Sequence, residues 1–427
     1  MIDNKFRNFI LFWLSQSVSQ LGTSMTSFAL LIWAYKQTSS VMSVSLMTFF
    51  SYLPYVIVSV FAGVFIDNHK KKKIMLWSDS IATICSTIVW VLLFTGKLKI
   101  NYIYIINSIN GFVNAFQSPS LTVAIGIMVP KDKYSKASGM NSFANSLITI
   151  VAPMLAAFIS SFWGLPSIIL IDLATFVFAF VVLLFCISIP EQLEKKMNNN
   201  YNIFYACKEG VEFILKHKGI WYIFMSMASM NLFSHLTYEN ILSPMILARS
   251  GGNDNVLGIV SGVLGIGGIV GGLIVSFVKL PNDNLKLMYF SAAFSFAFGD
   301  LLMGLGQNSY IWCLAAIAAS IPMPFINAGQ NVIMYNIIPT EMQGRVFAVR
   351  NAVQYCTIPI AILLGGASAD YIFEPFMLSD NKCALLLRKI VGTGAGSGMA
   401  VMFLCTGILG FLTSVLWYQN KNIRKLM

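Results

Sequence analysis

Charged side chains are scarce in this sequence. Asp, Glu, Lys and Arg make up only 11% of the 427 residues, whereas 57% are hydrophobic. Soluble domains carry about 25% charged residues, because polar groups must cover the surface of a globule. The mean hydropathy of +0.73 points the same way. This composition excludes an ordinary water-soluble domain and predicts an integral membrane protein.

Several chemical motifs are also missing. No P-loop lysine pattern occurs, so ATP hydrolysis by this chain is not indicated. The seven cysteines show no paired spacing, which argues against a disulfide framework. No nucleophile–base set and no metal-ligand cluster converges in the pattern, so we expect neither an enzyme nor a cofactor or metal. The stretch "GIGGIVGG" lies inside an apolar run, where small residues favour close helix packing over nucleotide binding.

Long apolar runs dominate the remaining sequence. A helix needs roughly 20 apolar residues to cross a bilayer. Twelve such segments are predicted, which makes the expected fold class an all-α integral membrane protein. Their ranges are 9–35, 41–66, 74–96, 100–129, 138–163, 165–189, 219–247, 255–279, 286–306, 309–338, 346–372 and 398–418.

The basic residues predict an orientation. With the N-terminus inside, 21 of the 28 lysines and arginines fall in inner loops and termini, as the positive-inside rule requires. We therefore expect a multi-pass protein of the cell membrane with both termini in the cytoplasm. This asymmetry accounts for the net charge of +11, so nucleic acid is not an expected partner, whereas the lipid bilayer is.

Matching residues recur at one fixed distance along the chain. Gly63 and Gly272, Asp67 and Ser276, and Pro130 and Pro339 are each 209 positions apart. Such an internal repeat predicts two six-helix bundles in the same orientation, a known transporter plan. The expected domains are an N-terminal bundle at 1–189, a cytoplasmic linker at 190–218 and a C-terminal bundle at 219–427.

Three stretches carry a family resemblance that covers nearly the whole chain. "GVFIDNHKKKK" resembles the loop motif after helix two of the major facilitator superfamily. "IPTEMQGRVFAV" (residues 338–349) and "GVEFILKHKG" (residues 210–219) resemble the macrolide-efflux and siderophore-export branch. The resemblance implies a major facilitator fold of two six-helix repeats. It also implies secondary active transport by alternating access, without a cofactor.

The loop after helix two has two interpretations. The resemblance implies a cytoplasmic gate, in which Asp67 lies against the start of helix eleven and a basic partner. Its expected members are Gly63, Asp67, Lys71, Lys72 and Arg345. A carboxylate at a helix N-terminus gains roughly 0.3–2 kcal/mol, a contact weak enough to open and close. The alternative is a solvated aspartate beside lysines that only fix topology and meet anionic lipid.

Polar side chains at helical spacing predict a substrate cavity, which the resemblance places between helices one, four, seven and ten. Each of these helices carries such residues on one stripe. The candidates are Gln16, Gln20, Asn107, Asn110, Asn114, Gln117, Asn231, Asn327, Gln330 and Asn331. The same amides serve equally well as hydrogen-bonding groups between helices, which accounts for up to half of them.

Ionisable residues inside a membrane segment are functional candidates by default. His235 and Glu239, four residues apart on helix seven, are candidates for proton coupling, and so is Asp300 in helix nine. Asp79 and Asp172 lie nearer the ends of their segments, where structural pairing is expected. Related exporters carry a coupling acid in helix one, where this sequence has Thr23.

Three functions remain open at this stage. The first is a monomeric exporter that moves an amphiphilic small molecule outward in exchange for protons. A macrolide-like drug is the first substrate expected, and a siderophore or other metabolite the second. An importer or facilitator of a small nutrient has the same fold and needs no protons. A membrane-embedded enzyme or receptor fits least, since no catalytic cluster is present.

Overall fold

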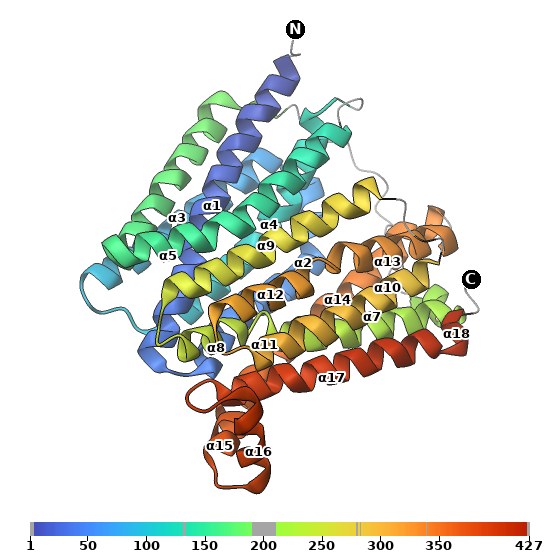
Figure 1. The fold of residues 1–427 in the computed structure, drawn as a ribbon. Helices are drawn as coiled ribbons and strands as arrows, with labels where there is room; N and C mark the ends of the chain where they lie inside the picture. Colours follow the sequence, from blue (N-terminus) through green and yellow to red (C-terminus); the bar gives the residue numbers. More distant parts are fainter. Residues whose placement is uncertain are drawn as a thin grey trace. The chain divides into compact units, whose positions relative to one another are not determined.

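A computed structural model describes residues 4–130, 134–189, 211–278, 281, 283–338 and 340–424. Every regular element among these residues is a helix (Figure 1). The chain separates into two compact units, the first formed by Met1–Ser39 and Leu46–Lys195 and the second by Ser40–Ser45 and Lys196–Met427. The short segment Ser40–Ser45, expected in the N-terminal bundle, thus packs in the second unit.

The first unit consists of long helices that follow the first six predicted segments. They are α1 (Asn4–Thr38), α2 (Val41–Asn68), α3 (Lys71–Phe94), α4 (Ile100–Met128), α5 (Tyr134–Val181) and the π-helical end η2 (Val182–Cys186). Within α5 the backbone turns at Gly164, which has φ 73° and ψ 175°. A positive φ suits glycine because it has no Cβ. This kink, followed by Pro166, separates the helices predicted at 138–163 and 165–189.

The second unit follows the remaining six segments, with more interruptions. Its helices are α7 (Lys218–Thr237), α8 (Leu242–Arg249), α9 (Asp254–Phe277), α10 (Asn284–Phe294), η3 (Ser295–Asp300), α11 (Leu301–Leu305), α12 (Ser309–Ser320), α13 (Met323–Ile337), α14 (Thr340–Ser368), η4 (Ala369–Phe373), α15 (Glu374–Leu378), α16 (Lys382–Val391), α17 (Ser397–Gln419) and α18 (Lys421–Arg424).

Three predicted segments in the second unit differ from the helices observed. The single helix expected at 219–247 breaks at residues 238–241, between α7 and α8. The one expected at 309–338 breaks at Ile321 and Pro322, since proline lacks the N–H that a continuous helix needs. The segment expected at 346–372 begins earlier, at Thr340. Hydropathy alone does not reveal such breaks, because they change backbone hydrogen bonds and leave the apolar character intact.

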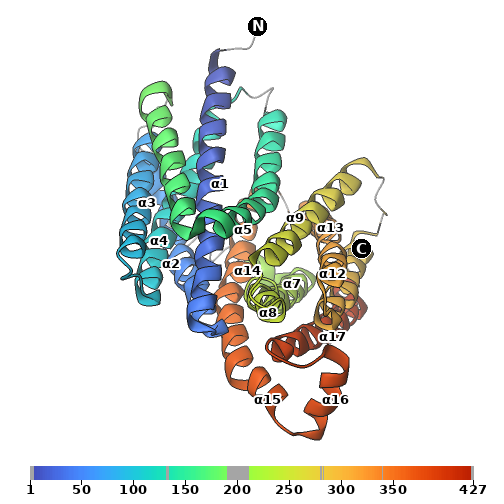
Figure 2. The ribbon, with the colours of Figure 1, turned by 60° about the vertical axis from the view of Figure 1, so that its left-hand side comes forward.

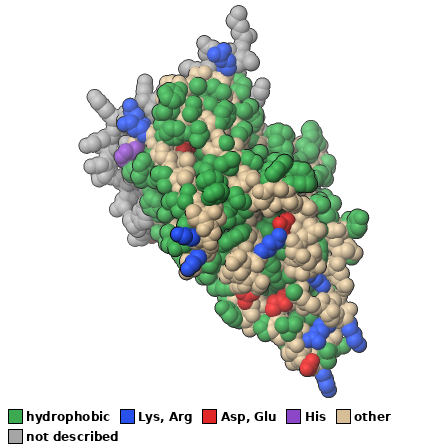
Figure 3. Space-filling model, turned by 90° about the vertical axis from the view of Figure 1, so that its left-hand side faces the viewer, with side chains coloured by type: hydrophobic (Ala, Val, Ile, Leu, Met, Phe, Trp, Pro, Cys, Tyr) green, Lys and Arg blue, Asp and Glu red, His purple; other side chains and the backbone are tan. Residues whose placement is uncertain are grey.

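Helix length and surface character both fit a membrane protein. Eight segments among the described residues are long and apolar enough to cross a membrane, the longest being Phe143–Cys186 across the α5 kink. Hydrophobic side chains cover much of the face drawn in Figure 3, where charged side chains are sparse. Such a surface is stable in contact with lipid and not with water. The chain is a multi-pass helical membrane protein.

Close helix contacts at small residues hold each unit together. In the second unit, a Cβ added at Gly271 of α9 would lie 2.2 Å from the carbonyl oxygen of Ile321. In the first unit, one added at Gly111 of α4 would lie 2.1 Å from the carbonyl oxygen of Ser51 on α2. Gly271, in the glycine-rich run of α9, therefore serves helix packing, as the sequence predicted for that run.

Candidate functional site

A buried carboxylate joins three helices of the first unit. Asp172, in the second half of α5, is only 1% exposed. Its Oδ1 accepts a hydrogen bond from the hydroxyl of Thr23 on α1 at 3.2 Å, and its Oδ2 accepts one from Ser86 on α3 at 3.4 Å. Thr23 stands where the family resemblance placed a coupling acid. The hydroxyl there contacts an acid supplied by another helix.

A second buried carboxylate joins three helices of the second unit. Asp300, at the end of η3, is also 1% exposed, and its Oδ2 accepts a hydrogen bond from Thr406 on α17 at 2.7 Å. Tyr238, just after α7, packs its ring edge-on against Phe403 of α17 with the centroids 5.5 Å apart. The Tyr238 hydroxyl and Asp300 Oδ1 are buried without a hydrogen-bond partner among the described residues.

The two carboxylates occupy related positions in the repeat. Asp172 belongs to the sixth predicted segment and meets the first and third. Asp300 belongs to the ninth and meets the twelfth, with Tyr238 of the seventh nearby. In the predicted repeat, segments one, three and six correspond to segments seven, nine and twelve, so the two junctions involve corresponding helices. Hydroxyl groups contact each carboxylate, and no basic side chain among the described residues does. A buried, uncompensated carboxylate is expensive in a membrane and is a functional candidate by default.

The amide stripe on α4 divides between two roles. Gln117 donates a hydrogen bond to Asp79 Oδ1 on α3 at 2.6 Å, which gives Asp79 the structural pairing expected for it. Asn107 donates to the carbonyl oxygen of Met47 on α2 at 3.0 Å. Asn114 is exposed, and Asn110 has a buried Oδ1 with no partner among the described residues. Two of the four amides therefore bond helices together, and two remain available.

The other cavity candidates are spread over α1, α7 and α13. Gln20, Asn327 and Asn331 are exposed, whereas Gln16 and Asn231 are half-buried. Gln330 is buried, and its Nε2 lacks a partner among the described residues, as does that of Gln16. Asn331 accepts a hydrogen bond from Arg350 of α14 at 3.4 Å. Sequence reasoning had not assigned Arg350 a role.

The predicted proton-coupling residues separate into two groups. His235 lies in the last turn of α7, with its Nδ1 buried and unpartnered among the described residues, and it interacts electrostatically with Glu239. Glu239 is exposed in the turn that follows the helix, because α7 ends at Thr237. Asp300 forms the separate junction with Thr406. Among the described residues, no chain of hydrogen bonds joins His235, Glu239 and Asp300.

The predicted cytoplasmic gate is only partly described. Gly63 and Asp67 lie near the end of α2, and Arg345 lies in the second turn of α14, but their side chains fall outside the described part. Lys71 is buried. Lys72 donates hydrogen bonds to the carbonyl oxygens of Leu184 and Ile187, at 3.0 and 2.7 Å. Lys72 therefore caps the end of η2, and the contact of Asp67 with helix eleven stays a prediction.

Asp370 makes a contact that sequence reasoning missed. Its Oδ1 accepts a hydrogen bond from the backbone N–H of Val41 at 3.0 Å. Its Oδ2 accepts one from the N–H of Met42 at 2.9 Å and one from the Ser40 hydroxyl at 2.6 Å. The carboxylate thus caps the start of α2, within the second unit. No local signal predicts a pair of residues 330 positions apart.

Asn240 reinforces the same junction. Its Oδ1 accepts a hydrogen bond from the Ser45 hydroxyl, and its Nδ2 donates to the carbonyl oxygen of Ile362 at 2.7 Å. Asn240 lies in the turn at residues 238–241 between α7 and α8. The start of α2, the end of α7 and the second half of α14 are therefore tied through one buried amide.

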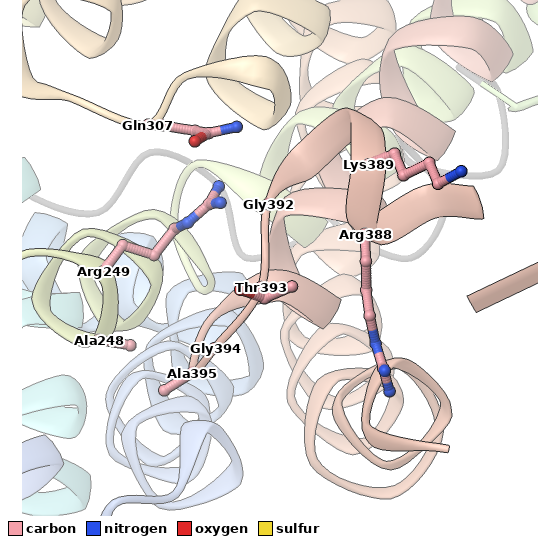
Figure 4. A pocket seen from close by; sticks show the side chains of 9 residues that line it. All are labelled: Ala248, Arg249, Gln307, Arg388, Lys389, Gly392, Thr393, Gly394 and Ala395. Carbon is pink, nitrogen blue, oxygen red and sulfur yellow. The ribbon is translucent and has the colours of Figure 1, made fainter. Parts of the chain in front are cut away.

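A polar cavity of about 560 Å³ lies beside the loop at residues 392–395 (Figure 4). Its lining includes Arg249, Gln307, Arg388, Lys389 and Thr393 and no acidic residue. Arg249 donates hydrogen bonds to the carbonyl oxygens of Gly306, at 3.1 Å, and of Val391. Burial lowers the pKa of its guanidinium from the ordinary value, while the charge of Glu374 acts in the opposite direction. Arg249 therefore joins the ends of α8, α11 and α16.

Comparison with known proteins places this fold. The chain is 25% identical over 368 residues to macrolide efflux protein A of Streptococcus pyogenes, covering 85% of this chain and 90% of that protein. It is 22% identical over 320 residues to the staphyloferrin A transporter of Staphylococcus aureus, covering 74% and 78%. A bacterial homologue of the iron transporter ferroportin, solved in an inward-facing state, matches with a TM-score of 0.71, 12% identity and coverage of 98% and 100%. The family model of the Major Facilitator Superfamily matches residues 12–363. The chain belongs to the major facilitator superfamily of membrane transporters.

Proposed function

We propose that this transporter exports a bulky amphiphilic small molecule, such as a macrolide, in exchange for protons. The observation that carries the proposal is the match to macrolide efflux protein A, which extends over 85% of this chain and 90% of that protein. The available amides on α4 and α13 and the scarcity of charge also favour an amphiphile. A sugar phosphate or dicarboxylate would need a cluster of basic groups inside the membrane.

Proton exchange requires a group that gains and loses a proton inside the membrane. Asp300 and Asp172 are buried carboxylates held by hydroxyls, and His235 with Glu239 is the third possibility. When a carboxylate has no basic partner, only hydrogen bonds compensate its negative charge. Binding a proton then removes a charge that is costly in an apolar environment. On this ground we give Asp300 the first place among these candidates, and Glu239 with its neighbour His235 the next.

The proposed orientation places both termini in the cytoplasm of the producing cell, with the protein in its cell membrane as a monomer. In this orientation the Asp67 loop lies on the cytoplasmic side and the Asp370 junction on the outer side. A contact of a carboxylate with a helix N-terminus suits a gate, because its free energy is small.

The match to the staphyloferrin A transporter supports a second candidate, the export of a siderophore. The two candidates differ in the compound that leaves the cell. An iron-starved strain that secretes a siderophore would lose it from the medium when the gene is deleted, if this second function holds. A macrolide exporter would leave secretion unchanged.

Transport by whole cells and by proteoliposomes tests the first proposal. We expect pump-deficient bacteria that produce the protein to accumulate less radiolabelled macrolide, and to lose this difference when a protonophore is added. In proteoliposomes, an imposed pH gradient should drive uptake of the compound against its concentration gradient. Unchanged accumulation of all compounds tested, or movement independent of the pH gradient, would overturn macrolide–proton exchange and favour the importer or facilitator.

Two variants locate the coupling group. Asp300→Asn and Glu239→Gln each remove one titrating carboxylate. The variant that hits the coupling group should abolish gradient-driven transport while keeping exchange of labelled for unlabelled substrate, which needs no net proton movement. Asp380→Asn is the matched control, because Asp380 is exposed in the turn before α16. Full gradient-driven activity in both test variants would remove these two residues from the coupling path.

A further inference from the structure

The helix α16 differs in direction from the long helices of the second unit. In Figure 1, α16 runs crosswise to the long helix α17, near the end of α17 remote from the C-terminus, whereas α15 continues the chain from α14 and η4 (Figure 2). A helix crosswise to the crossing helices of its own bundle lies roughly along the membrane plane. The hairpin that α16 forms with α15 is therefore placed where the headgroup layer begins.

The hairpin is firmly attached and internally ordered. Arg388 donates hydrogen bonds to the carbonyl oxygens of Met377 and Ser379, at 2.7 and 2.9 Å, which ties α16 to α15. The side chain of Asn381 caps α16 by accepting from the N–H of Cys383 at 3.0 Å. Glu374 accepts a hydrogen bond from the N–H of Met399 at the start of α17, at 3.0 Å. These contacts fix which face of α16 is turned inward.

The outward face of α16 combines apolar and basic side chains. Ala384 and Val391 are fully buried against the protein, whereas Leu386 is 60% and Ile390 51% exposed. The spacing of residues 382, 386, 389 and 390 places them on one side of a helix, and all four are exposed. Lys382 and Lys389 thus flank the two apolar side chains. Long lysine stems beside apolar residues are typical of helices that lie in a membrane interface.

The apolar surface of the hairpin is continuous with a membrane-crossing segment. The candidate span Cys356–Leu378 runs through η4 and α15, and its last residue, Leu378, is 72% exposed. If the hairpin were surrounded by water, the exposed hydrophobic side chains at the end of this span would contact water, which is unfavourable. Continuity with the span favours lipid as the contact, and the two lysines favour a negatively charged headgroup.

We propose that α16 is an interfacial helix that binds acidic phospholipid in the outer leaflet. The hydrocarbon packs against Leu386 and Ile390, and the phosphate is held by Lys382 and Lys389. The assignment to the outer leaflet rests on the proposed orientation of the termini. The lipid contact itself does not depend on the exported substrate, because no measurement below uses transport.

Lipid retention tests the role of the two lysines. The protein is purified in detergent from membranes containing phosphatidylglycerol, and the bound lipid is measured by mass spectrometry. The double variant Lys382→Gln/Lys389→Gln should retain less phosphatidylglycerol, by on the order of tenfold. The control Lys97→Gln/Lys99→Gln removes two exposed lysines from a loop of the first unit and should retain the wild-type amount. Equal losses in both variants would overturn the site.

A label on α16 tests the placement of the helix. Cys383 is exposed on α16, so a variant with the other six cysteines replaced by serine accepts a fluorescent label there alone. In vesicles of phosphatidylcholine and phosphatidylglycerol, a lipid-attached quencher should reach the label and a water-soluble quencher should not. Quenching only from water, or from neither side as in a protein–protein contact, would overturn the proposal. Displacement of bound phosphatidylglycerol by inorganic phosphate would assign the lysines to a free anion and overturn it as well.

Discussion

The hydroxyl of Thr406 donates a hydrogen bond of 2.7 Å to Asp300, and both side chains are buried in the second unit. It is the one hydrogen bond of standard geometry that the described residues give to the Asp300 carboxylate. The Tyr238 hydroxyl lies close enough to interact with the same carboxylate. Thr406 therefore supplies the better-formed of two hydroxyl contacts at this junction.

Thr406→Val removes that hydroxyl and keeps the shape of the side chain. We expect a loss of about 1–2 kcal/mol in the free energy of unfolding, because the buried carboxylate then loses its well-formed hydrogen bond. A thermal unfolding midpoint in detergent measures the effect. Thr413→Val on the same helix is the control, since the Thr413 hydroxyl bonds only to carbonyl oxygens of its own helix. Equal midpoints for the two variants would contradict the assigned role.

Two neighbouring glycines of α9 should respond in opposite ways to alanine. At Gly271, a Cβ would lie 2.2 Å from the carbonyl oxygen of Ile321, whereas at Gly272 it would meet nothing within 4 Å. Gly271→Ala should therefore destabilise the second unit by roughly 1–3 kcal/mol through overpacking. Gly272→Ala should be neutral or stabilising by up to about 1 kcal/mol, since alanine favours the helix. The unfolding midpoints of both variants decide the matter.

Lys72 and Lys73 should differ although they are adjacent in a run of four lysines. Lys72 donates to the carbonyl oxygens of Leu184 and Ile187, whereas Lys73 is exposed. Lys72→Met should lower the unfolding free energy by about 1–2 kcal/mol, because the end of η2 loses its cap. Lys73→Met should change it by less than about 0.5 kcal/mol. If Lys72→Met instead leaves stability unchanged and slows transport, the gate role implied by the family resemblance is favoured.

Asp370→Ala should loosen the start of α2 within the second unit. The carboxylate satisfies the N–H groups of Val41 and Met42, and loss of a helix cap costs roughly 0.5–2 kcal/mol. The reaction of Ser40→Cys with a water-soluble thiol reagent measures this loosening. We expect the double variant Ser40→Cys/Asp370→Ala to react faster than the single variant Ser40→Cys, by on the order of threefold to thirtyfold for that range of free energy. Asp380→Ala, at an exposed position, supplies the control. An unchanged reaction rate would show that the cap does not hold the segment in place.

The sequence by itself determined the class of the protein and most of its helices. Hydrophobic runs are local features, so their length and composition predict crossing segments without any knowledge of packing. The resemblance of residues 338–349 and of the loop after helix two correctly indicated the family. In the glycine-rich run of α9, Gly267 and Gly271 were correctly assigned to helix packing, whereas a Cβ at Gly268 or Gly272 would meet nothing within 4 Å.

The tertiary structure alone decided which polar groups meet. Asp172 contacts Thr23 and Ser86 across 149 and 86 positions of the chain, and Asp370 contacts Val41 across 329. Such pairs depend on how helices rotate and cross, which a one-dimensional pattern of hydrophobicity leaves open. The α4 stripe shows the same limit. Its spacing predicts four amides on one side of a helix, but only packing turns Asn107 toward α2 and Gln117 toward α3 and leaves Asn114 exposed.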